Sequence, residues 1–316
     1  MALDISLIEI FENITSRAAL ASYHFVGKKD KTAADKAAVD VMRNLLNNLD
    51  IQGKIVIGEG ELDKSPMLYI GEKVGTGNGL KMDIAVDPLE GTNFAANDLP
   101  GALSVIAVAE ENNLFHAPET YMNKIAVGSN VPKDAIDLDN SLKKNIYNLA
   151  DCKNKDITQL TACLLDRPRH QKIIDELNKL KVNLKLITDG DVSGALLVSD
   201  DKYRIDIFMG IGGGPEGVLA ASALDAYNCN FQGRFIFEEE NDISRAKKMG
   251  IKELDRKYEL SEIISGDSIF CATGVTSGDL VKGIELIDNK YISETLITHK
   301  NSNTKKIIKR TENLNS

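Results

Sequence analysis

The sequence predicts a layered α/β fold, and three features lead to this prediction. Short apolar runs rich in β-branched residues recur along the chain, which is typical of strands buried on both faces of a sheet. Segments in which apolar residues have helical spacing precede these runs and lie between them. The 316 residues, 43% of them hydrophobic, suffice for one large domain or two domains of common size.

Two helices are expected first, because the apolar residues within 7–25 and within 38–49 fall on one helical face in each segment. Thr32 to Asp35 predict a capping box at the start of the second helix, with the acid at the third helical position. Further helices are expected within 168–177 and 216–223. The predicted buried strands are 54–57, 83–86, 103–108, 161–165, 184–187, 205–209 and 268–271.

The chain is expected to divide into two α/β halves, residues 1–135 and 136–316. The predicted boundary is the polar segment 130–155, which is rich in Asp, Asn and Lys but has no flexible Gly/Ser or Pro linker. The charged segment 238–256 predicts a solvated helical surface, and the polar residues 305–316 are expected to fray.

Charge and composition argue against several classes of protein. Lys and Arg number 38 against 47 Asp and Glu, a net charge of −9 that disfavours nucleic acids and anionic membranes as partners. No apolar run approaches the length of a membrane span, and the N-terminal segment has acids where a signal peptide needs bases. The four cysteines have no CxxC spacing, which indicates reduced thiols. We therefore predict a cytoplasmic protein.

Segments rich in acids and glycines follow four of the predicted strands, at 58–63, 87–93, 189–191 and 210–217. Ligands bind at strand ends in open α/β sheets, because loops converge there on a rigid frame. Grouped carboxylates without Cys or His favour Mg²⁺ or Mn²⁺ over zinc. Two such ions can clamp a phosphoryl group and lower the pKa of a bound water, which lets an acidic protein bind an anionic ester. The pattern predicts metal-dependent phosphate chemistry.

Each of these features also has a simpler structural explanation. A single acidic turn is most simply a solvated loop, and only the occurrence of four favours a metal site. Asp35 alone is more simply a helix cap, and Tyr121 a half-buried packing residue. Arg167 and Arg169 are either a basic helix start or a phosphate grip. The four histidines have no ligand spacing, so none is assigned to catalysis.

A dinucleotide-binding site is a competing interpretation. Residues 212–217 fit the pattern GxGxxG, and Glu238 lies about 20 residues further on, as that pattern expects. However, Glu216 would repel a pyrophosphate at the helix N-terminus, and the other three acidic segments would stay unexplained. We rank an NAD-binding oxidoreductase below the metal-dependent enzyme.

Several segments resemble class II fructose-1,6-bisphosphatase of the GlpX type, within the lithium-sensitive, metal-dependent sugar phosphatase superfamily. They are 55–75 (IVIGEGELDKSPMLYIGEKVG), 83–92 (DIAVDPLEGT), 189–191 and 210–217. The resemblance implies a layered α-β-α-β-α sandwich, dependence on Mn²⁺ or Mg²⁺, and a homo-oligomer, either a dimer or a tetramer. It also implies hydrolysis of the 1-phosphate of fructose 1,6-bisphosphate, giving fructose 6-phosphate, in gluconeogenesis and the wider metabolism of carbohydrate and glycerol.

The resemblance also implies site residues, motif by motif. The N-terminal half would hold most of the metal ligands, and the C-terminal half the last metal ligand and sugar-phosphate contacts. The implied metal ligands are Asp35, Glu59, Asp87, Glu90 and Glu216. The implied sugar-phosphate contacts are Glu90, Gly91, Thr92, Tyr121, Arg167, Pro168, Arg169, Asp189, Gly190, Asp191 and Gly213.

As a mechanism, we hypothesise that Thr92 orients a metal-activated water for in-line attack. The threonine hydroxyl stays protonated near neutral pH, so a carboxylate must act as the base. Asp35, Glu61 and Asp63 are the candidates, and the sequence does not choose among them. Sedoheptulose-1,7-bisphosphatase and inositol monophosphatase activities remain open, as does a noncatalytic metal- or anion-binding protein.

Overall fold

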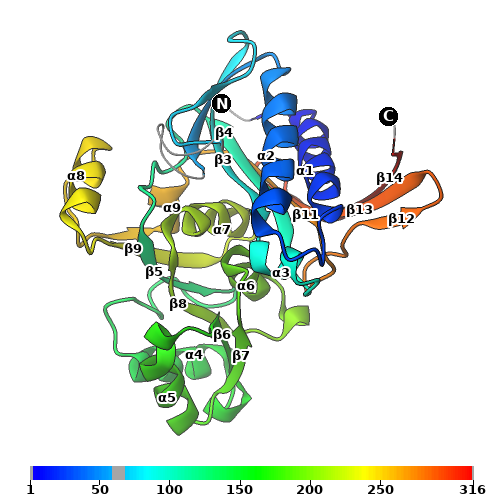
Figure 1. Cartoon of the computed structure of the whole chain (residues 1–316). Coiled ribbons are helices and arrows are strands. Elements are labelled where there is room, and N and C mark those ends of the chain that lie inside the picture. The colour runs from blue at the N-terminus through cyan, green and yellow to red at the C-terminus, as the bar shows by residue number, and fades with distance from the viewer. Residues whose placement is uncertain (1–2, 59–67, 315–316) are drawn as a thin grey trace. The chain divides into compact units, whose positions relative to one another are not determined.

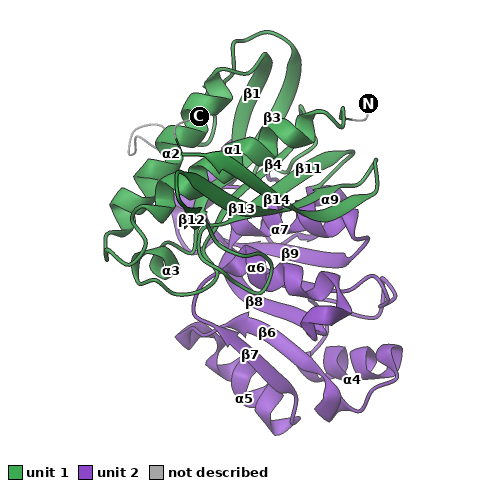
Figure 2. Cartoon of the chain, turned by 90° about the vertical axis from the view of Figure 1, so that its right-hand side faces the viewer, with its two compact units in different colours: residues 1–116, 264–316 green, residues 117–263 purple. Residues whose placement is uncertain are grey.

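The computed structural model describes residues 3–58 and 68–314, which belong to two compact units (Figure 1). Unit 1 comprises residues 1–116 and 264–316, and unit 2 comprises residues 117–263 (Figure 2). The division therefore differs from the predicted boundary at 135/136, which falls inside unit 2. Residues 264–316 return to unit 1 because β11 (Ser268–Gly274) pairs along its length with β4 (Leu103–Glu110).

Unit 1 is built on a sheet of eight strands, counted over the described residues. Their order is β12-β13-β11-β4-β3-β1-β2, and β14 pairs with the remaining edge of β13. The apolar runs predicted as buried strands lie in β1, β3, β4 and β11, and β11 is buried at every residue. The bounds not yet given are β1 Ile51–Ile57, β2 Lys73–Val74, β3 Leu80–Glu90, β12 Glu285–Ile287, β13 Lys290–His299 and β14 Thr304–Asn313.

Helices α1 (Leu7–Tyr23) and α2 (Lys31–Asn47) pack side by side in unit 1 (Figure 1). Helix α1 also contacts β4, β11 and β13, and α2 contacts β3 and the short helix α3 (Thr92–Ala96). The capping box predicted at Thr32 to Asp35 is wrong, because α2 begins earlier. Asp30 is the N-cap and its carboxylate accepts a hydrogen bond from Ala33 N at 2.9 Å, so Asp35 lies inside the helix.

The C-terminal segment forms a strand, so the expected fraying of residues 305–316 is wrong for the part that the structure describes. Strand β14 pairs with β13 in unbroken register from Lys290↔Asn313 to His299↔Thr304. The Arg310 guanidinium also forms an ion pair with the buried Glu12 carboxylate of α1, N to O 2.6 Å. Local polarity did not predict these long-range contacts.

Unit 2 contains a second sheet, with strand order β10-β9-β5-β8-β6-β7 over the described residues. Strands β6, β7 and β8 are parallel where they pair, and β5 is antiparallel to both β8 and β9. The bounds are β5 Tyr121–Val127, β6 Thr161–Leu165, β7 Asn183–Ile187, β8 Ile207–Gly213, β9 Asn230–Ile236 and β10 Lys257–Glu259.

The helices of unit 2 include one that is buried on all sides. In α7 every residue from 217 to 226 is buried, as is typical of a helix that is apolar all round. The predicted boundary segment 130–155 contains α4 and lies inside unit 2, whereas the predicted charged helical surface is confirmed at α8. The helices are α4 Leu142–Lys153, α5 Gln171–Lys179, α6 Asp191–Leu196, α7 Gly214–Ala226, α8 Glu240–Lys248 and α9 Leu260–Ile263; the 3₁₀ turns are η1 Ile157–Gln159, η2 Pro168–His170, η3 Leu197–Ser199 and η4 Asp201–Tyr203.

The predicted layered α/β class is confirmed, since each unit has one sheet with helices packed against its strands. Across residues 3–58 and 68–314, no helix is both long and apolar enough to cross a membrane.

Candidate active site

The predicted ligands of unit 1 lie around the end of β3. Asp87 pairs with Val105 and Glu90 with Leu103, so β3 has an extra residue opposite β4 between these pairs. Pro88 lies in this irregularity, where its missing N–H costs no ladder bond. The strand ends at Glu90, and Gly91 turns the chain with φ of 76° into α3, which starts at Thr92.

Two of the predicted carboxylate ligands of unit 1 are buried. Asp35 is 5% exposed and Glu90 is 4% exposed, while Asp87 is half-buried. Asp35 lies on α2, which packs against β3 and α3. Charged side chains are almost never buried to this degree without a partner or a metal.

Three predicted site residues, Glu59, Glu61 and Asp63, lie outside the described residues. Among residues 3–58 and 68–314, no three Asp, Glu, His or Cys side chains are close enough together to form a metal site. The described carboxylates therefore offer ligands of the right type without forming a complete set.

The predicted residues of unit 2 all lie at one edge of its sheet. Strands β6, β7 and β8 run parallel, so their carboxyl ends meet at the same edge. Arg167 to Arg169 follow β6, Asp189 to Asp191 follow β7, and β8 runs into Gly213 and Glu216. Strand β5 runs the other way and begins there, with Tyr121 directly opposite Gly213.

Arg169 is held in place at this edge by two contacts. Its guanidinium lies over the Tyr121 ring, 4.9 Å from the ring centroid. Its Nε donates a hydrogen bond to Ile211 O at 2.9 Å. Pro168 precedes it at the start of η2, where a missing N–H is tolerated, and Arg167 is half-buried. A basic, exposed side chain oriented in this way is suited to gripping a phosphate.

His170 connects β6 to β8 through its imidazole, which is completely buried. Ile211 N donates to Nε2 at 2.7 Å, so the ring proton is on Nδ1, which donates to Leu165 O at 2.7 Å. Burial lowers the pKa of this imidazole. His170 is therefore a neutral bridge beside Gly210 of β8, where φ is 126° and a Cβ would lie 2.8 Å from Nε2.

The glycines at the end of β8 make room for carboxylates. A Cβ on Gly212 would lie 2.0 Å from Asp191 Oδ2, and a Cβ on Gly213 would lie 1.7 Å from Glu216 Oε2. The side chains of Asp191 and Glu216 therefore lie directly on these two glycines. This packing explains the glycine run without a nucleotide, and the two carboxylates oppose a pyrophosphate there.

These two carboxyl groups are buried and incompletely hydrogen-bonded. Asp191 is 8% exposed. Asp191 Oδ1 and Glu216 Oε2 accept no hydrogen bond from the described residues. Burial raises the pKa of the Glu216 carboxyl, while the nearby Lys124 ammonium opposes that shift. Buried oxygens with unused lone pairs are suitable ligands for a hard divalent cation, so Glu216 fits its predicted role.

Sequence reasoning missed a buried lysine that contacts two of the predicted site residues. Lys124 lies on β5, is 1% exposed, and its Nζ donates to Asp191 Oδ2 and to Gly213 O. The available signal was its spacing, because Met122, Lys124 and Ala126 share one face of the strand. His170 was likewise not recognised as a bridge, since both of its partners are main-chain atoms.

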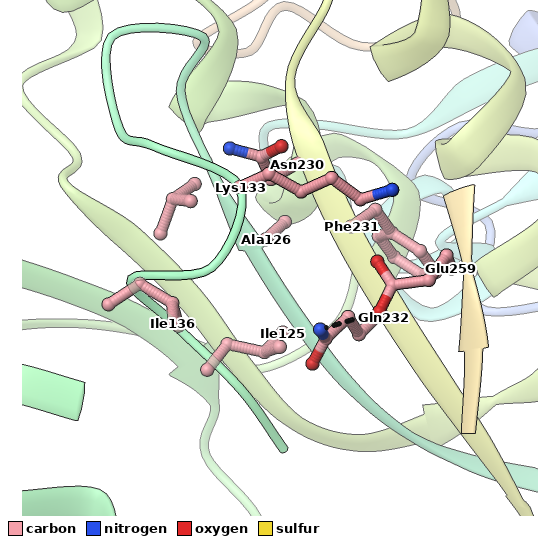
Figure 3. Close-up of a pocket in the computed structure, with 9 residues that line it drawn as sticks. Ile125, Ala126, Lys133, Ile136, Asn230, Phe231, Gln232 and Glu259 are labelled. Atoms are coloured by element: carbon pink, nitrogen blue, oxygen red, sulfur yellow. Dashed lines mark hydrogen bonds between the residues drawn. The ribbon is translucent and has the colours of Figure 1, made fainter. Parts of the chain in front are cut away.

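A small hollow elsewhere in unit 2 lies against β5 and β9 (Figure 3). Figure 3 shows Gln232 Nε2 donating to Glu259 Oε1, at 2.9 Å. None of the predicted site residues lines the hollow. Its lining residues are Ile125, Ala126, Val127, Lys133, Ile136, Asn230, Phe231, Gln232 and Glu259.

The fold and these groups together define a class of protein. Buried carboxylates, a strand-to-helix turn of sequence DPLEGT in unit 1 and two arginines after β6 in unit 2 are the parts of a metal-dependent phosphatase of small phosphate esters.

The chain belongs to the family of bacterial fructose-1,6-bisphosphatases encoded by glpX, whose model matches residues 6–312. It is 42% identical over 308 residues to fructose-1,6-bisphosphatase 1 class 2 of Escherichia coli (strain K12), covering 93% of this chain and 91% of that protein. It is 38% identical over 327 residues to D-fructose 1,6-bisphosphatase class 2/sedoheptulose 1,7-bisphosphatase of Thermosynechococcus vestitus (strain NIES-2133 / IAM M-273 / BP-1), covering 95% of this chain and 94% of that protein.

Among solved structures, the extragenic suppressor protein suhB from Bartonella henselae aligns with a TM-score of 0.37 and 11% identity, over 65% of this chain and 76% of that chain. That similarity is too low to support an argument.

Proposed function

We propose that this protein is a class II fructose-1,6-bisphosphatase, which hydrolyses the 1-phosphate of fructose 1,6-bisphosphate to fructose 6-phosphate and phosphate. The observation that carries the proposal is the match to this family along residues 6–312. The DPLEGT segment at the turn from β3 to α3 supplies the chemistry that such a reaction needs. We place the reaction in the cytoplasm, in gluconeogenesis, and expect the enzyme to be a homo-oligomer.

We assign the divalent metal ions to Asp35, Glu59, Asp87, Glu90 and Glu216. Mn²⁺ or Mg²⁺ is the proposed cofactor, because every assigned ligand is a carboxylate. When bound, such ions polarise the scissile phosphate and acidify a water molecule. Glu216 Oε2, which is buried and accepts no hydrogen bond from the described residues, supports this assignment.

Thr92 is the proposed orienting residue for the attacking water. It is the first residue of α3, directly after Gly91, so its position is set by the helix start. The water oxygen forms the new bond to phosphorus, the ester bond to the sugar oxygen breaks, and that oxygen takes up a proton. A carboxylate accepts the proton of the water, and Asp35, Glu61 and Asp63 are the candidates.

The remaining assigned residues bind the sugar phosphate. Arg167 and Arg169 grip the distal phosphate, and the contact of Arg169 with Tyr121 keeps its guanidinium in position. Hydroxyl groups of the sugar are the natural partners of carboxylate and main-chain acceptors. These contacts are assigned to Glu90, Gly91, Thr92, Tyr121, Pro168, Asp189, Gly190, Asp191 and Gly213.

Sedoheptulose 1,7-bisphosphate is a second candidate substrate. The relative from Thermosynechococcus vestitus has sedoheptulose 1,7-bisphosphatase in its name, and it matches 95% of this chain. The phosphate chemistry is the same for both sugars, so the same site residues would serve. Inositol monophosphates remain a substrate class to be tested in parallel.

The test is phosphate release by the purified protein after chelation, and again after Mn²⁺ or Mg²⁺ is restored. Fructose 1,6-bisphosphate, sedoheptulose 1,7-bisphosphate and inositol 1-phosphate are compared at equal concentration, with a Glu90→Gln variant as the inactive control. We expect metal-restored release that favours fructose 1,6-bisphosphate. Phosphate release from only one of the other esters would change the assigned substrate. No release from any of the three esters would refute the proposal.

A further inference from the structure

The strongest unassigned feature of unit 2 is the buried cation Lys124. A lysine is almost never fully buried unless it is paired, and here the ammonium has two acceptors. One is the carboxylate of Asp191, and the other is Gly213 O at 2.8 Å. Both acceptors belong to residues assigned to the sugar phosphate, although Lys124 itself belongs to neither assigned set.

The packing around Lys124 fits this placement. A Cβ on Gly217 would lie 3.2 Å from Lys124 Cδ and 2.6 Å from Met122 Sδ, so the first turn of α7 has no side chain where the lysine stem passes. The ammonium of Lys124, on β5, therefore reaches Gly213 at the end of the paired strand β8. Its two acceptors are the Asp191 carboxylate at the start of α6 and the carbonyl of Gly213 at the end of β8.

The charges around this point require a cation. Asp191 and Glu216 both lie against the glycines of β8, and two buried carboxylates without a neutralising partner repel each other. Lys124 supplies one positive charge and donates a hydrogen bond to Asp191 Oδ2. Asp191 Oδ1 accepts no hydrogen bond from the described residues. The lysine thus fixes the carboxylate by one oxygen and leaves the other available.

We propose that Lys124 is a positioning residue for the substrate, which holds the Asp191 carboxylate and the Gly213 carbonyl so that the free oxygen of Asp191 can accept a hydrogen bond from a sugar hydroxyl. This inference rests on the proposed function, because it assigns the hydroxyl to the sugar bisphosphate. Lys124 acts through Asp191 and does not touch the reacting phosphate.

The test is a double-mutant cycle with Lys124→Met, Asp191→Asn and the combined variant. Lys124→Met should raise the KM for fructose 1,6-bisphosphate by about 10-fold or more and change kcat much less. In the Asp191→Asn background, the same substitution should change KM by less than about twofold, because the residue that it positions has already been altered. Effects on KM that multiply would overturn the proposal, as would a folded Lys124→Met variant with the wild-type KM.

A matched control is available in the same unit. Lys153 is a half-buried lysine whose side chain is 7% exposed, with its Nζ 2.7 Å from Asp206 Oδ1, and neither residue belongs to the predicted site. Lys153→Met should lower stability and leave KM unchanged. If it raised KM as much as Lys124→Met, the effect would be structural and the proposal would fail.

Two further measurements keep the test decisive. If Lys124→Met does not fold, Lys124→Gln, which retains an N–H donor group, takes its place in the cycle. Lys124→Arg keeps the positive charge and should bring KM back toward the wild-type value. Urea unfolding of the metal-free variants should show that the two substitutions are not additive. If the wild type releases no phosphate from fructose 1,6-bisphosphate, the proposed function fails. Separately, additive effects of the two substitutions on the free energy of unfolding would refute the pairing of Lys124 with Asp191.

Discussion

Replacing His170 by Phe tests whether the bridge between β6 and β8 stabilises the edge of the sheet where the substrate residues lie. The substitution keeps a planar ring but removes both nitrogen atoms. It leaves Ile211 N without the partner that it now has at 2.7 Å, and it removes one of two donors from Leu165 O, which still accepts a hydrogen bond from Arg167 N at 3.0 Å. An orphaned buried polar group costs about 1–3 kcal/mol.

The size of the effect follows from the surroundings of the two groups. Leu165 is buried, whereas Ile211 is half-buried, so water can partly satisfy its N–H. Leu165 O also keeps its hydrogen bond from Arg167 N, so we expect the free energy of unfolding to fall by about 1–3 kcal/mol, a substantial part of the roughly 5–15 kcal/mol typical of a folded protein. Urea unfolding at pH 8, with the exposed His24→Asn as control, measures it.

The pH dependence gives a second, independent signature. Because burial lowers the pKa of His170, the unfolded state takes up its proton first as the pH falls. The stabilisation is complete above an unfolded pKa of about 6.5 and is lost below it. Up to about 1.4 kcal/mol should disappear by pH 5.5 in the wild type. A phenylalanine ring cannot titrate, so the His170→Phe variant should lack this loss. Equal pH dependence in both proteins, or equal stability at pH 8, would refute the reasoning.

Three further predictions concern the reaction. Thr92→Ala should lower kcat by about 100-fold or more, measured by phosphate release, and most activity remaining would contradict its orienting role. Arg169→Ala should raise KM more than it lowers kcat, because a grip on the distal phosphate is equally strong in the ground state and the transition state; a pure kcat defect would count against that grip. Gly213→Ala places a Cβ 1.7 Å from Glu216 Oε2 in a backbone that any residue adopts, with φ −66° and ψ 142°. Calorimetric titration should show Mn²⁺ binding about 10- to 100-fold weaker, and unchanged affinity would remove Glu216 from the metal ligands.

Much of the fold followed from local patterns. The runs at 83–86, 103–108 and 268–271 lie within β3, β4 and β11, because an apolar β-branched run has few stable alternatives to a buried strand. Strand β5 was missed, since Asn123 and Lys124 interrupt its apolar pattern. Lys124 is compatible with the interior only because Asp191, 67 residues away in the chain, neutralises it.

The candidate site was predictable in its chemistry and less so in its arrangement. The acids and glycines after the strands indicated phosphate chemistry, because that set of side chains has few other uses at strand ends. The parallel pairing of β6 with β7 and β8 then places Arg169, Asp189 and Gly213 at one edge in unit 2. The glycines of β8 receive a different explanation from the structure, since they admit the carboxylates of Asp191 and Glu216.

The sequence by itself determined the α/β class and indicated phosphate chemistry. These depend on residues close together in the chain, where spacing and side-chain chemistry are sufficient. Only the tertiary structure decided that residues 264–316 complete the sheet of unit 1, that residues 304–313 form a strand, and that Lys124 is buried against Asp191. Each of these depends on the pairing of segments distant in sequence, whose free energy comes from burial and hydrogen bonds that no local window contains.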